Sequence, residues 1–277
     1  MEVLVVIGVG GMGRAIARRQ GSGKALLIAD HDSGALRAVA DDLRGDGHDV
    51  TTRQVDVSER EQVAELARAA AELGTVTQVA HTAGLSPVQA TAEAILRVDL
   101  LGVALVLEEF GRVIARGGAG VVIASMAGYL AAPLTAEQES ALADTPADEL
   151  LRLSFADPRT VTNPGAAYGI AKRGNQVRVR AASAHWGERG ARVNSISPGV
   201  ISTPMGQQEL ASASGGVMRA MVAASATRRV GTPEDVAAAT AFLLGPDSTF
   251  ITGTDLLVDG GAVAAIRSGR VRFDARP

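Results

Sequence analysis

Tyr168 and Lys172 have the residue types and the spacing for proton transfer. They lie four positions apart in a segment with helical pattern, so both side chains project from one face of the helix. Free tyrosine has a pKa of about 10, and a nearby ammonium group stabilises the phenolate and lowers that pKa. The pair is therefore a candidate for acid–base catalysis near neutral pH. A tyrosine beside an extended lysine also occurs in ordinary helices, so the spacing alone does not decide.

Ser125 strengthens the catalytic interpretation. It ends the apolar run 121–125, and the carboxyl ends of parallel strands are where α/β sheets bind ligands. A serine hydroxyl there can hydrogen-bond a reacting oxygen. The chain contains only two tyrosines, so Tyr168 is not readily explained as one of many core aromatics.

The elements that must position these residues alternate along the whole chain. Apolar, strand-length runs are separated by Ala-rich helical patterns such as 61–73, 92–115 and 233–244. This alternation predicts an α/β fold, a single doubly wound parallel sheet of about seven strands with helices on both faces. The strands are expected near 2–7, 25–29, 50–55, 77–81, 119–124, 191–196 and 255–258.

A glycine-rich turn follows the first expected strand and opens a helix. Its sequence, Gly8-Val-Gly10-Gly11-Met12-Gly13, matches G-x-G-x-x-G. Such a turn lets the backbone approach a pyrophosphate, and the helix N-terminus supplies free N–H groups to the anion. Glycine turns can also serve only to pack helix on strand, but the strand before, the helix after and an acidic residue downstream favour dinucleotide binding.

Asp30 is that acidic residue, at the end of the second expected strand. A carboxylate there accepts hydrogen bonds from ribose hydroxyls and repels a 2′-phosphate, so NAD is favoured over NADP. His31 beside it would soften the repulsion, and Asp30 alternatively only caps the following turn. Asp56 ends the third strand, where it would reach the adenine edge together with Val57; capping the segment after it explains Asp56 equally well.

Composition narrows the class of protein. The 277 residues are 47% hydrophobic and 21% charged, with a net charge of −3 and no cysteine, which indicates a globular domain without disulfides or thiolate metal sites. We predict no metal. The acidic balance argues against nucleic acid, and no apolar stretch or leader pattern indicates a membrane span or secretion. A cytoplasmic location is expected.

The chain resembles the short-chain dehydrogenase/reductase family from the glycine turn to the Val-Asp-Gly-Gly sequence at 258–261. Between them, the resemblance is carried by Asp56, Ala83-Gly84, Ser125, Tyr168-x-x-x-Lys172 and the Asn-Ser-Ile-Ser-Pro-Gly sequence at 194–199, followed by segments 229–235 and 251–253. It implies one NAD-binding Rossmann domain over residues 1–277 and an oxidoreductase that interconverts a secondary alcohol and a ketone.

The resemblance also implies roles for individual residues. Tyr168 would be the acid/base, Lys172 would bind the nicotinamide ribose and tune Tyr168, and Ser125 would orient the substrate. The turn after the sixth strand and Thr203 would hold the nicotinamide carboxamide. The implied cofactor-binding residues, beyond the catalytic pair, are Gly8, Gly10, Gly11, Met12, Gly13, Asp30, Asp56, Val57, Ala83, Gly84, Pro198, Gly199, Val200, Ile201 and Thr203.

Three positions depart from the family pattern. The glycine turn has two residues between Gly8 and Gly11 where the family usually has three. The fourth strand ends in His81-Thr82 where two asparagines are usual. Asp99 stands where the catalytic tetrad has an asparagine, whose backbone carbonyl can hold a water beside Lys172. Asp99 keeps that carbonyl, and its carboxylate either pairs with Lys172 or stays clear of it.

Residues 129–166 form an insertion before the tyrosine helix, with a brief helical pattern near 145–155. This length, and the sequence Ala-His-Trp-Gly-Glu at 184–188, resemble the bacterial 3α-hydroxysteroid dehydrogenase/carbonyl reductase branch, where an insertion alters the subunit interface. We expect the insertion either to cover the substrate or to reshape the contact of a homodimer or homotetramer.

Residues 200–225 are expected to form a lid over an apolar pocket. Val200, Ile201, Met205, Met218 and Met221 would line the pocket from this segment, and Met126, Tyr129 and Leu130 from the other side. A hydrophobic or steroid-like alcohol or ketone would fit; ordinary helix packing explains the methionines equally well. Two rival functions remain open, a non-catalytic dinucleotide sensor or scaffold and an epimerase or dehydratase on the same fold.

Overall fold

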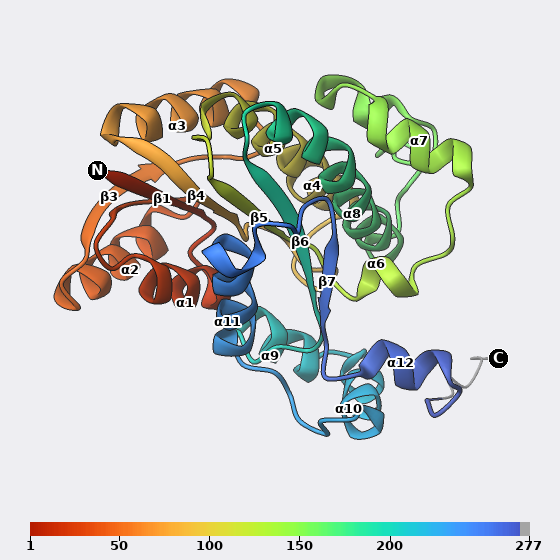
Figure 1. Cartoon of the computed structure of the whole chain (residues 1–277). Coiled ribbons are helices and arrows are strands. Elements are labelled where there is room, and N and C mark those ends of the chain that lie inside the picture. Colours follow the sequence, from red (N-terminus) through yellow and green to blue (C-terminus); the bar gives the residue numbers. More distant parts are fainter. Residues whose placement is uncertain (272–277) are drawn as a thin grey trace.

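One parallel sheet organises the molecule, described over residues 1–271 by a computed structural model. Its strand order is β3-β2-β1-β4-β5-β6-β7 (Figure 1). The predicted seven-stranded, doubly wound parallel sheet is thus confirmed. The strands are β1 Glu2–Ile7, β2 Ala25–Asp30, β3 Asp49–Gln54, β4 Thr75–His81, β5 Ala119–Ile123, β6 Arg192–Pro198 and β7 Asp255–Val258.

Helices cover both faces of the sheet because the central strands are apolar on both sides. On one face lie α1 (Gly11–Gln20), α2 (Ser33–Gly45) and α11 (Pro233–Leu244); on the other lie α3 (Arg60–Leu73), α5 (Gly102–Val113) and α8 (Pro164–Glu188) (Figure 1). Strand order reverses between β1 and β4, and the crevice outside the carboxyl ends of such strands is where this architecture binds ligands.

Two apolar layers hold these helices to the sheet. On the α3/α5/α8 face, Val5, Leu66, Phe110 and Trp186 belong to one large cluster of buried side chains. On the opposite face, buried residues of β1, β2, α1 and α2 form a second cluster. Each fully buried large side chain contributes about 1.5–3 kcal/mol through loss of apolar surface from water, so the glycine turn and the tyrosine helix start from rigid supports.

Local sequence signals set the helices that carry the site. Asn163 caps α8, accepting a hydrogen bond from the N–H of Ala166, and Pro164 occupies the first turn. The helix predicted over 92–115 is α4 (Ala92–Ile95), a π-helical segment (Leu96–Leu101) and α5 in succession. Asp99 lies in the π-helical segment, an irregularity that is common at functional sites and that the sequence did not predict.

Residues 129–166 contain more helix than the sequence suggested. α6 (Ala127–Leu130) and α7 (Ala136–Asp144) precede a 3₁₀ segment, Ala147–Arg152, which lies within the stretch predicted to be helical. α7 was not predicted from the sequence, although Thr135 and Gln138 form a capping box, which is a sequence signal for a helix N-terminus. α7 packs against α8, and its Leu142 is fully buried.

The C-terminal part of the chain lies at the carboxyl edge of β6 and β7. Here are α9 (Pro204–Ala211), α10 (Gly215–Ala224) and α12 (Ala262–Arg267) (Figure 1). A short 3₁₀ turn (Pro246–Ser248) lies at the opposite edge, before β7 begins, where Arg192 at the start of β6 donates to the carbonyl of Gly245. Residues 200–225 thus form two helices beyond the sheet edge. Across residues 1–271, no helix has the length and apolar character needed to cross a bilayer.

Candidate active site

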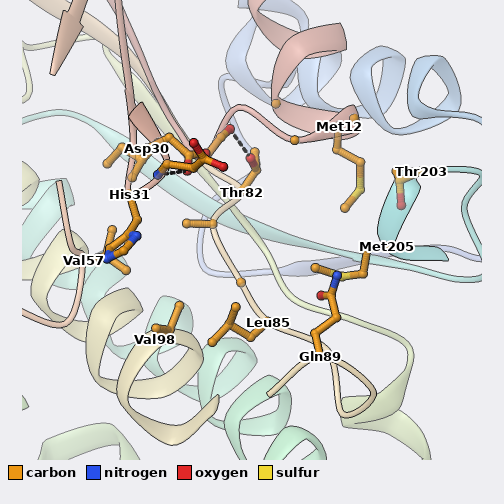
Figure 2. Close-up of a pocket in the computed structure, with 18 of the residues that line it drawn as sticks. Met12, Asp30, His31, Val57, Thr82, Leu85, Gln89, Val98, Thr203 and Met205 are labelled. Atoms are coloured by element: carbon orange, nitrogen blue, oxygen red, sulfur yellow. Dashed lines mark hydrogen bonds between the residues drawn. The ribbon is translucent and has the colours of Figure 1, made fainter. Parts of the chain in front are cut away.

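The glycine turn between β1 and α1 forms one wall of a cavity of about 550 Å³ (Figure 2). Gly8 has a φ of +92°, and a Cβ there would lie 2.4 Å from the backbone nitrogen of Ala83, so only glycine fits. Gly10 faces open space and precedes the N-terminus of α1, which has no side-chain cap. Free N–H groups and an uncrowded backbone fit a pyrophosphate.

Eleven of the residues implied to bind the cofactor line this one cavity. Figure 2 shows Asp30, His31 and Val57 on one side of it and Met12, Thr203 and Met205 on the other. The eleven are Gly8, Gly10, Gly11, Met12, Gly13, Asp30, Asp56, Val57, Ala83, Gly84 and Thr203. Although the glycine turn is one residue shorter than the family pattern, it therefore still faces the cavity that the predicted cofactor-binding residues line.

Asp30 lies at the end of β2 with its carboxylate held in place by backbone groups. One oxygen accepts a hydrogen bond from the N–H of Val9 at 2.7 Å, and the other from the N–H of Asp32 at 3.0 Å. It thus links the glycine turn to the second strand. Through the N–H of Asp32, Asp30 also caps the turn that follows it, so this alternative has a structural basis too; the helix after the turn is capped by Asp32, whose side chain accepts from Gly34 and Ala35.

Asp56 serves a local turn and also reaches the cavity. Its Oδ1 accepts hydrogen bonds from the backbone N–H and the hydroxyl of Ser58, at 2.9 and 2.8 Å. Both interpretations of Asp56 therefore have a structural basis, since the residue lines the cavity while it orders the loop before α3.

Thr82 is a cavity residue whose role the sequence did not show. Its hydroxyl donates a hydrogen bond to the carbonyl of Gly8 at 2.7 Å, joining the end of β4 to the glycine turn. A threonine in place of the usual asparagine thus still fixes the turn. Gln89 and Met205 also line the cavity without having been predicted to do so; Gln89 donates to the side chain of Gln208 in α9 at 2.7 Å.

Ser125, Tyr168 and Lys172 come together where the carboxyl end of β5 lies beside the first turns of α8. The Lys172 Nζ lies 5.4 Å from the centre of the Tyr168 ring and donates to the carbonyl of Ile123 at 3.5 Å. The Ser125 hydroxyl is near enough to Tyr168 to favour its phenolate form. Ser125 itself is fixed by the N–H of Ala127, which donates to its Oγ at 3.1 Å.

Asp99 pairs directly with Lys172. Its Oδ2 lies 2.9 Å from Nζ, and both side chains are almost wholly buried, with 0% and 5% exposed. The other oxygen, Oδ1, accepts the N–H of Leu85 at 2.8 Å. Gly84 permits this arrangement, since a Cβ there would lie 3.0 Å from the carboxylate and 3.2 Å from the ammonium. Of the two alternatives for Asp99, the structure shows the ion pair.

The balance of charges at Tyr168 differs from the prediction. Burial raises the pKa of Tyr168, Lys172 opposes the rise and Asp99 adds to it. The expected net lowering is therefore wrong for the protein chain by itself, because Asp99 offsets much of the lysine charge and partial burial disfavours the phenolate. Burial lowers the pKa of Lys172, but Asp99 outweighs this, so that the pKa of the ammonium is raised overall.

His81 is buried at the end of β4 with neither ring nitrogen hydrogen-bonded to a described residue. Burial lowers its pKa to about 3, and the charge of Lys172 acts in the same direction. The imidazole is therefore neutral at physiological pH.

The turn after β6 contributes less to the cofactor cavity than expected. Val200 and Ile201 are buried in separate apolar clusters, with Met126 and Ala262 around the first and β5, β6 and α11 residues around the second. Their side chains pack in the core and neither residue borders the first cavity, so their place in the cofactor site stays a prediction. Pro198 ends β6 and accepts a hydrogen bond from the N–H of Met126 at 2.9 Å. Gly199 borders a second cavity.

That second cavity, of about 710 Å³, lies next to the catalytic residues. Ser125, Tyr168 and Gly199 border it, and most of its other walls are apolar or small side chains. Met126, Leu130, Met218 and Met221 line it as predicted. Residues 131–134 and Gln138 of the inserted segment form another part of its wall.

Four predicted pocket residues, Val200, Ile201, Met205 and Tyr129, do not line this cavity. Tyr129 donates its hydroxyl to Asp255 at 2.8 Å; burial and that carboxylate raise its pKa to about 12. Met205 faces the cofactor cavity instead. A residue that the sequence did not reveal, Glu209 of α9, lines the second cavity one turn beyond Met205. Its burial raises its pKa, and its charge acts on Tyr168.

Comparison with known proteins agrees with this geometry. Residues 2–137 match the family model described as short chain dehydrogenase, and residues 134–263 match that described as enoyl-(acyl carrier protein) reductase. The short-chain dehydrogenase/reductase bsc3 of Alternaria brassicicola is 44% identical over 264 residues, covering 95% of this chain and 96% of that protein.

Two further relatives have named activities. Cis-4-hydroxycyclohexanecarboxylate dehydrogenase of Sinomonas cyclohexanicum is 30% identical, covering 95% of this chain and 97% of that protein. The 3-alpha-hydroxysteroid dehydrogenase/carbonyl reductase of Comamonas testosteroni is 27% identical, covering 87% and 97%. The chain belongs to the short-chain dehydrogenase/reductase family of oxidoreductases, whose members bind a nicotinamide dinucleotide.

Proposed function

We propose that this protein is an NAD-dependent oxidoreductase that interconverts a hydrophobic secondary alcohol and its ketone. The observation that carries the proposal is the convergence of Ser125, Tyr168 and Lys172 beside an apolar cavity of about 710 Å³. A phenol near a buried ammonium and a serine hydroxyl is suited to exchange a proton with an alcohol oxygen.

The residues of the glycine turn and Asp30 would hold the dinucleotide. The N-terminus of α1 favours the pyrophosphate, and the fixed carboxylate of Asp30 favours a ribose with a free 2′-hydroxyl, so NAD is the proposed cofactor. When bound, the nicotinamide supplies the hydride acceptor or donor.

The chain's own residues manage the proton. Tyr168 takes the alcohol proton during oxidation and returns it during reduction. Ser125 hydrogen-bonds the substrate oxygen and orients it, while Lys172 binds the ribose and stabilises the phenolate. Asp99 acts through Lys172, because its carboxylate fixes the ammonium 2.9 Å away and reduces its effect on Tyr168.

The surroundings of the cavity support a bulky, apolar, steroid-like substrate. Residues 200–225 would act as the lid, since Met218 and Met221 line the cavity. Segment 129–166 would cover the substrate, since residues 131–134 also line it. We further propose a homodimer or homotetramer as the assembly of this single-domain chain.

The test is a screen of secondary alcohols and ketones with NAD(H) and NADP(H), with the parent and Tyr168→Phe side by side. Removing the phenolic hydroxyl should lower kcat by at least about a hundredfold, the usual size of an acid–base contribution. Phenylalanine keeps the ring that packs in the site, so folding should be preserved. Equal turnover by parent and variant would refute the mechanism.

A further inference from the structure

Glu209 is the single charged side chain among the residues that border the second cavity. It comes from α9 and borders the same, mostly apolar space as Ser125 and Tyr168, and its charge acts on Tyr168. Within residues 1–271 no cation lies within 4 Å of it to form an ion pair, although the protein pairs most comparably buried acids elsewhere, such as Glu108 and Glu109 with Arg60.

The position of Glu209 is structurally supported. Thr203 caps α9: its side chain accepts a hydrogen bond from the N–H of Gly206, and this cap fixes the helix beside both cavities. Met205 then faces the cofactor cavity, and Glu209, four residues later, faces the substrate cavity. The fully buried Ser86, in the loop after β4, lies beside the Glu209 carboxyl and favours its ionised form.

When a substrate displaces water from a carboxylate in such a place, the carboxylate needs a new hydrogen-bond donor or a positive charge. An apolar ligand would leave its oxygens without partners, and a ligand carboxylate would set two like charges together; both cost free energy. A hydroxyl or an ammonium group would satisfy it. Enzymes that hydrogen-bond a substrate group in this way discriminate strongly against analogues that lack it.

We propose that Glu209 is a specificity residue that binds a hydrogen-bond donor, hydroxyl or ammonium, on a hydrophobic substrate at a distance from the reacting carbon. The substrate is then a diol or amino alcohol with an apolar body, and carboxylated analogues are rejected. This inference rests on the proposed function for the location of the reacting carbon beside Tyr168.

Four cyclohexanols that differ only at carbon 4 provide a matched series. Their substituents are hydrogen, hydroxyl, amine and carboxylate, the three substituted compounds being cis isomers; the last is the compound in the name of the Sinomonas relative. Dissociation constants are measured by calorimetry with NAD⁺ present, in the Tyr168→Phe background so that no turnover occurs. Glu209→Gln, Glu209→Lys and Glu137→Gln are compared; Glu137 is an exposed residue of α7, so the last removes an equal charge outside the cavity.

With Glu209 present, the hydroxyl and amine compounds should bind at least about tenfold more tightly than the carboxylate, as expected for a charge-assisted hydrogen bond. Glu209→Gln should bring the amine and carboxylate within about threefold of each other. Glu209→Lys should reverse their order, and Glu137→Gln should retain the original preference. Equal binding of amine and carboxylate with Glu209 intact, or no measurable binding of the hydroxyl and amine compounds, would overturn the proposal; so would an unchanged preference in Glu209→Gln.

Turnover by the protein with Tyr168 intact separates this inference from the proposed function. If Glu209 controls binding but none of the four compounds is oxidised, the specificity site stands and oxidation of this alcohol class is refuted. If they are oxidised with a preference that ignores Glu209, the enzyme function stands and the specificity site is refuted.

Discussion

Replacing Asp99 with asparagine should move the pH dependence of alcohol oxidation toward acid. The substitution removes the negative partner of Lys172 and keeps an oxygen that can accept the N–H of Leu85, now bound at 2.8 Å. It leaves the shape of the site nearly unchanged. The lysine charge then acts on Tyr168 without a carboxylate beside it, which lowers the pKa of Tyr168.

The distances give the size of the effect. With an effective dielectric constant of about 20, an ammonium 5.4 Å from the ring centre stabilises the phenolate by about 3 kcal/mol. Asp99, 2.9 Å from that ammonium, is at most about 8 Å from the ring centre and opposes this by about 2 kcal/mol. Since 1.36 kcal/mol corresponds to one pH unit, the Asp99→Asn variant should titrate about 1.5 pH units lower.

The assay is kcat/KM for alcohol oxidation between pH 5 and 10. Oxidation needs the phenolate, so kcat/KM rises with pH through the pKa of Tyr168, and in the variant that rise should come at lower pH. Asp247→Asn, an exposed site far from the cavity, should leave the profile unchanged. A rise at the same or a higher pH in a folded Asp99→Asn protein would refute the electrostatic role assigned to the ion pair.

Three further predictions follow from other parts of the structure. Asp30→Ala should lower the NAD/NADP ratio of kcat/KM by about tenfold, because it removes the carboxylate that repels a 2′-phosphate; an unchanged ratio would exclude Asp30 from the ribose site. His81→Asn should reduce the loss of stability that the protein undergoes as the pH is lowered. The unfolded chain protonates His81 below about pH 6.5, whereas the folded protein does so only near pH 3. As the pH is lowered through this window, the parent therefore loses up to about 1.4 kcal/mol of unfolding free energy per pH unit. Urea unfolding at pH 4.5–7 should show a smaller change of unfolding free energy with pH in the variant. Leu142→Ala should cost about 3 kcal/mol of unfolding free energy, since this side chain is fully buried between α7 and its neighbours; a loss below about 1 kcal/mol would show that α7 packs loosely.

The sheet and the cofactor cavity could be predicted because their signals are local and repeated. Each buried strand is a short apolar run between helical patterns, and the predicted strand positions differ from the observed ones by only one or two residues at each end. The glycine turn is equally local: the φ of +92° at Gly8 and its close approach to Ala83 both require glycine at a position that the motif already marks.

The contacts that tune the site could not be predicted, because they join distant segments. Whether Asp99 meets Lys172 depends on a π-helical turn and on the space left by Gly84, neither of which a spacing rule contains. Glu209 stands on a helix with little sequence pattern, and only the fold brings it to the cavity of Tyr168. α7 is different, because the capping box formed by Thr135 and Gln138 is a local signal that the sequence itself contains.

Two departures from the family pattern, at positions 81 and 99, share one electrostatic consequence. Lys172 is buried, and an uncompensated ammonium there would carry a large desolvation cost; Asp99 offsets it at 2.9 Å. A charged imidazole at His81 would restore an excess of positive charge in the same buried region, and both burial and Lys172 keep His81 neutral. The buried set therefore holds one positive and one negative charge, and Tyr168 faces a nearly neutral pair instead of a lone cation. In the proposed cycle, the positive charge that favours the phenolate must then come in large part from the nicotinamide when it is bound, which couples proton transfer to the presence of the oxidised cofactor.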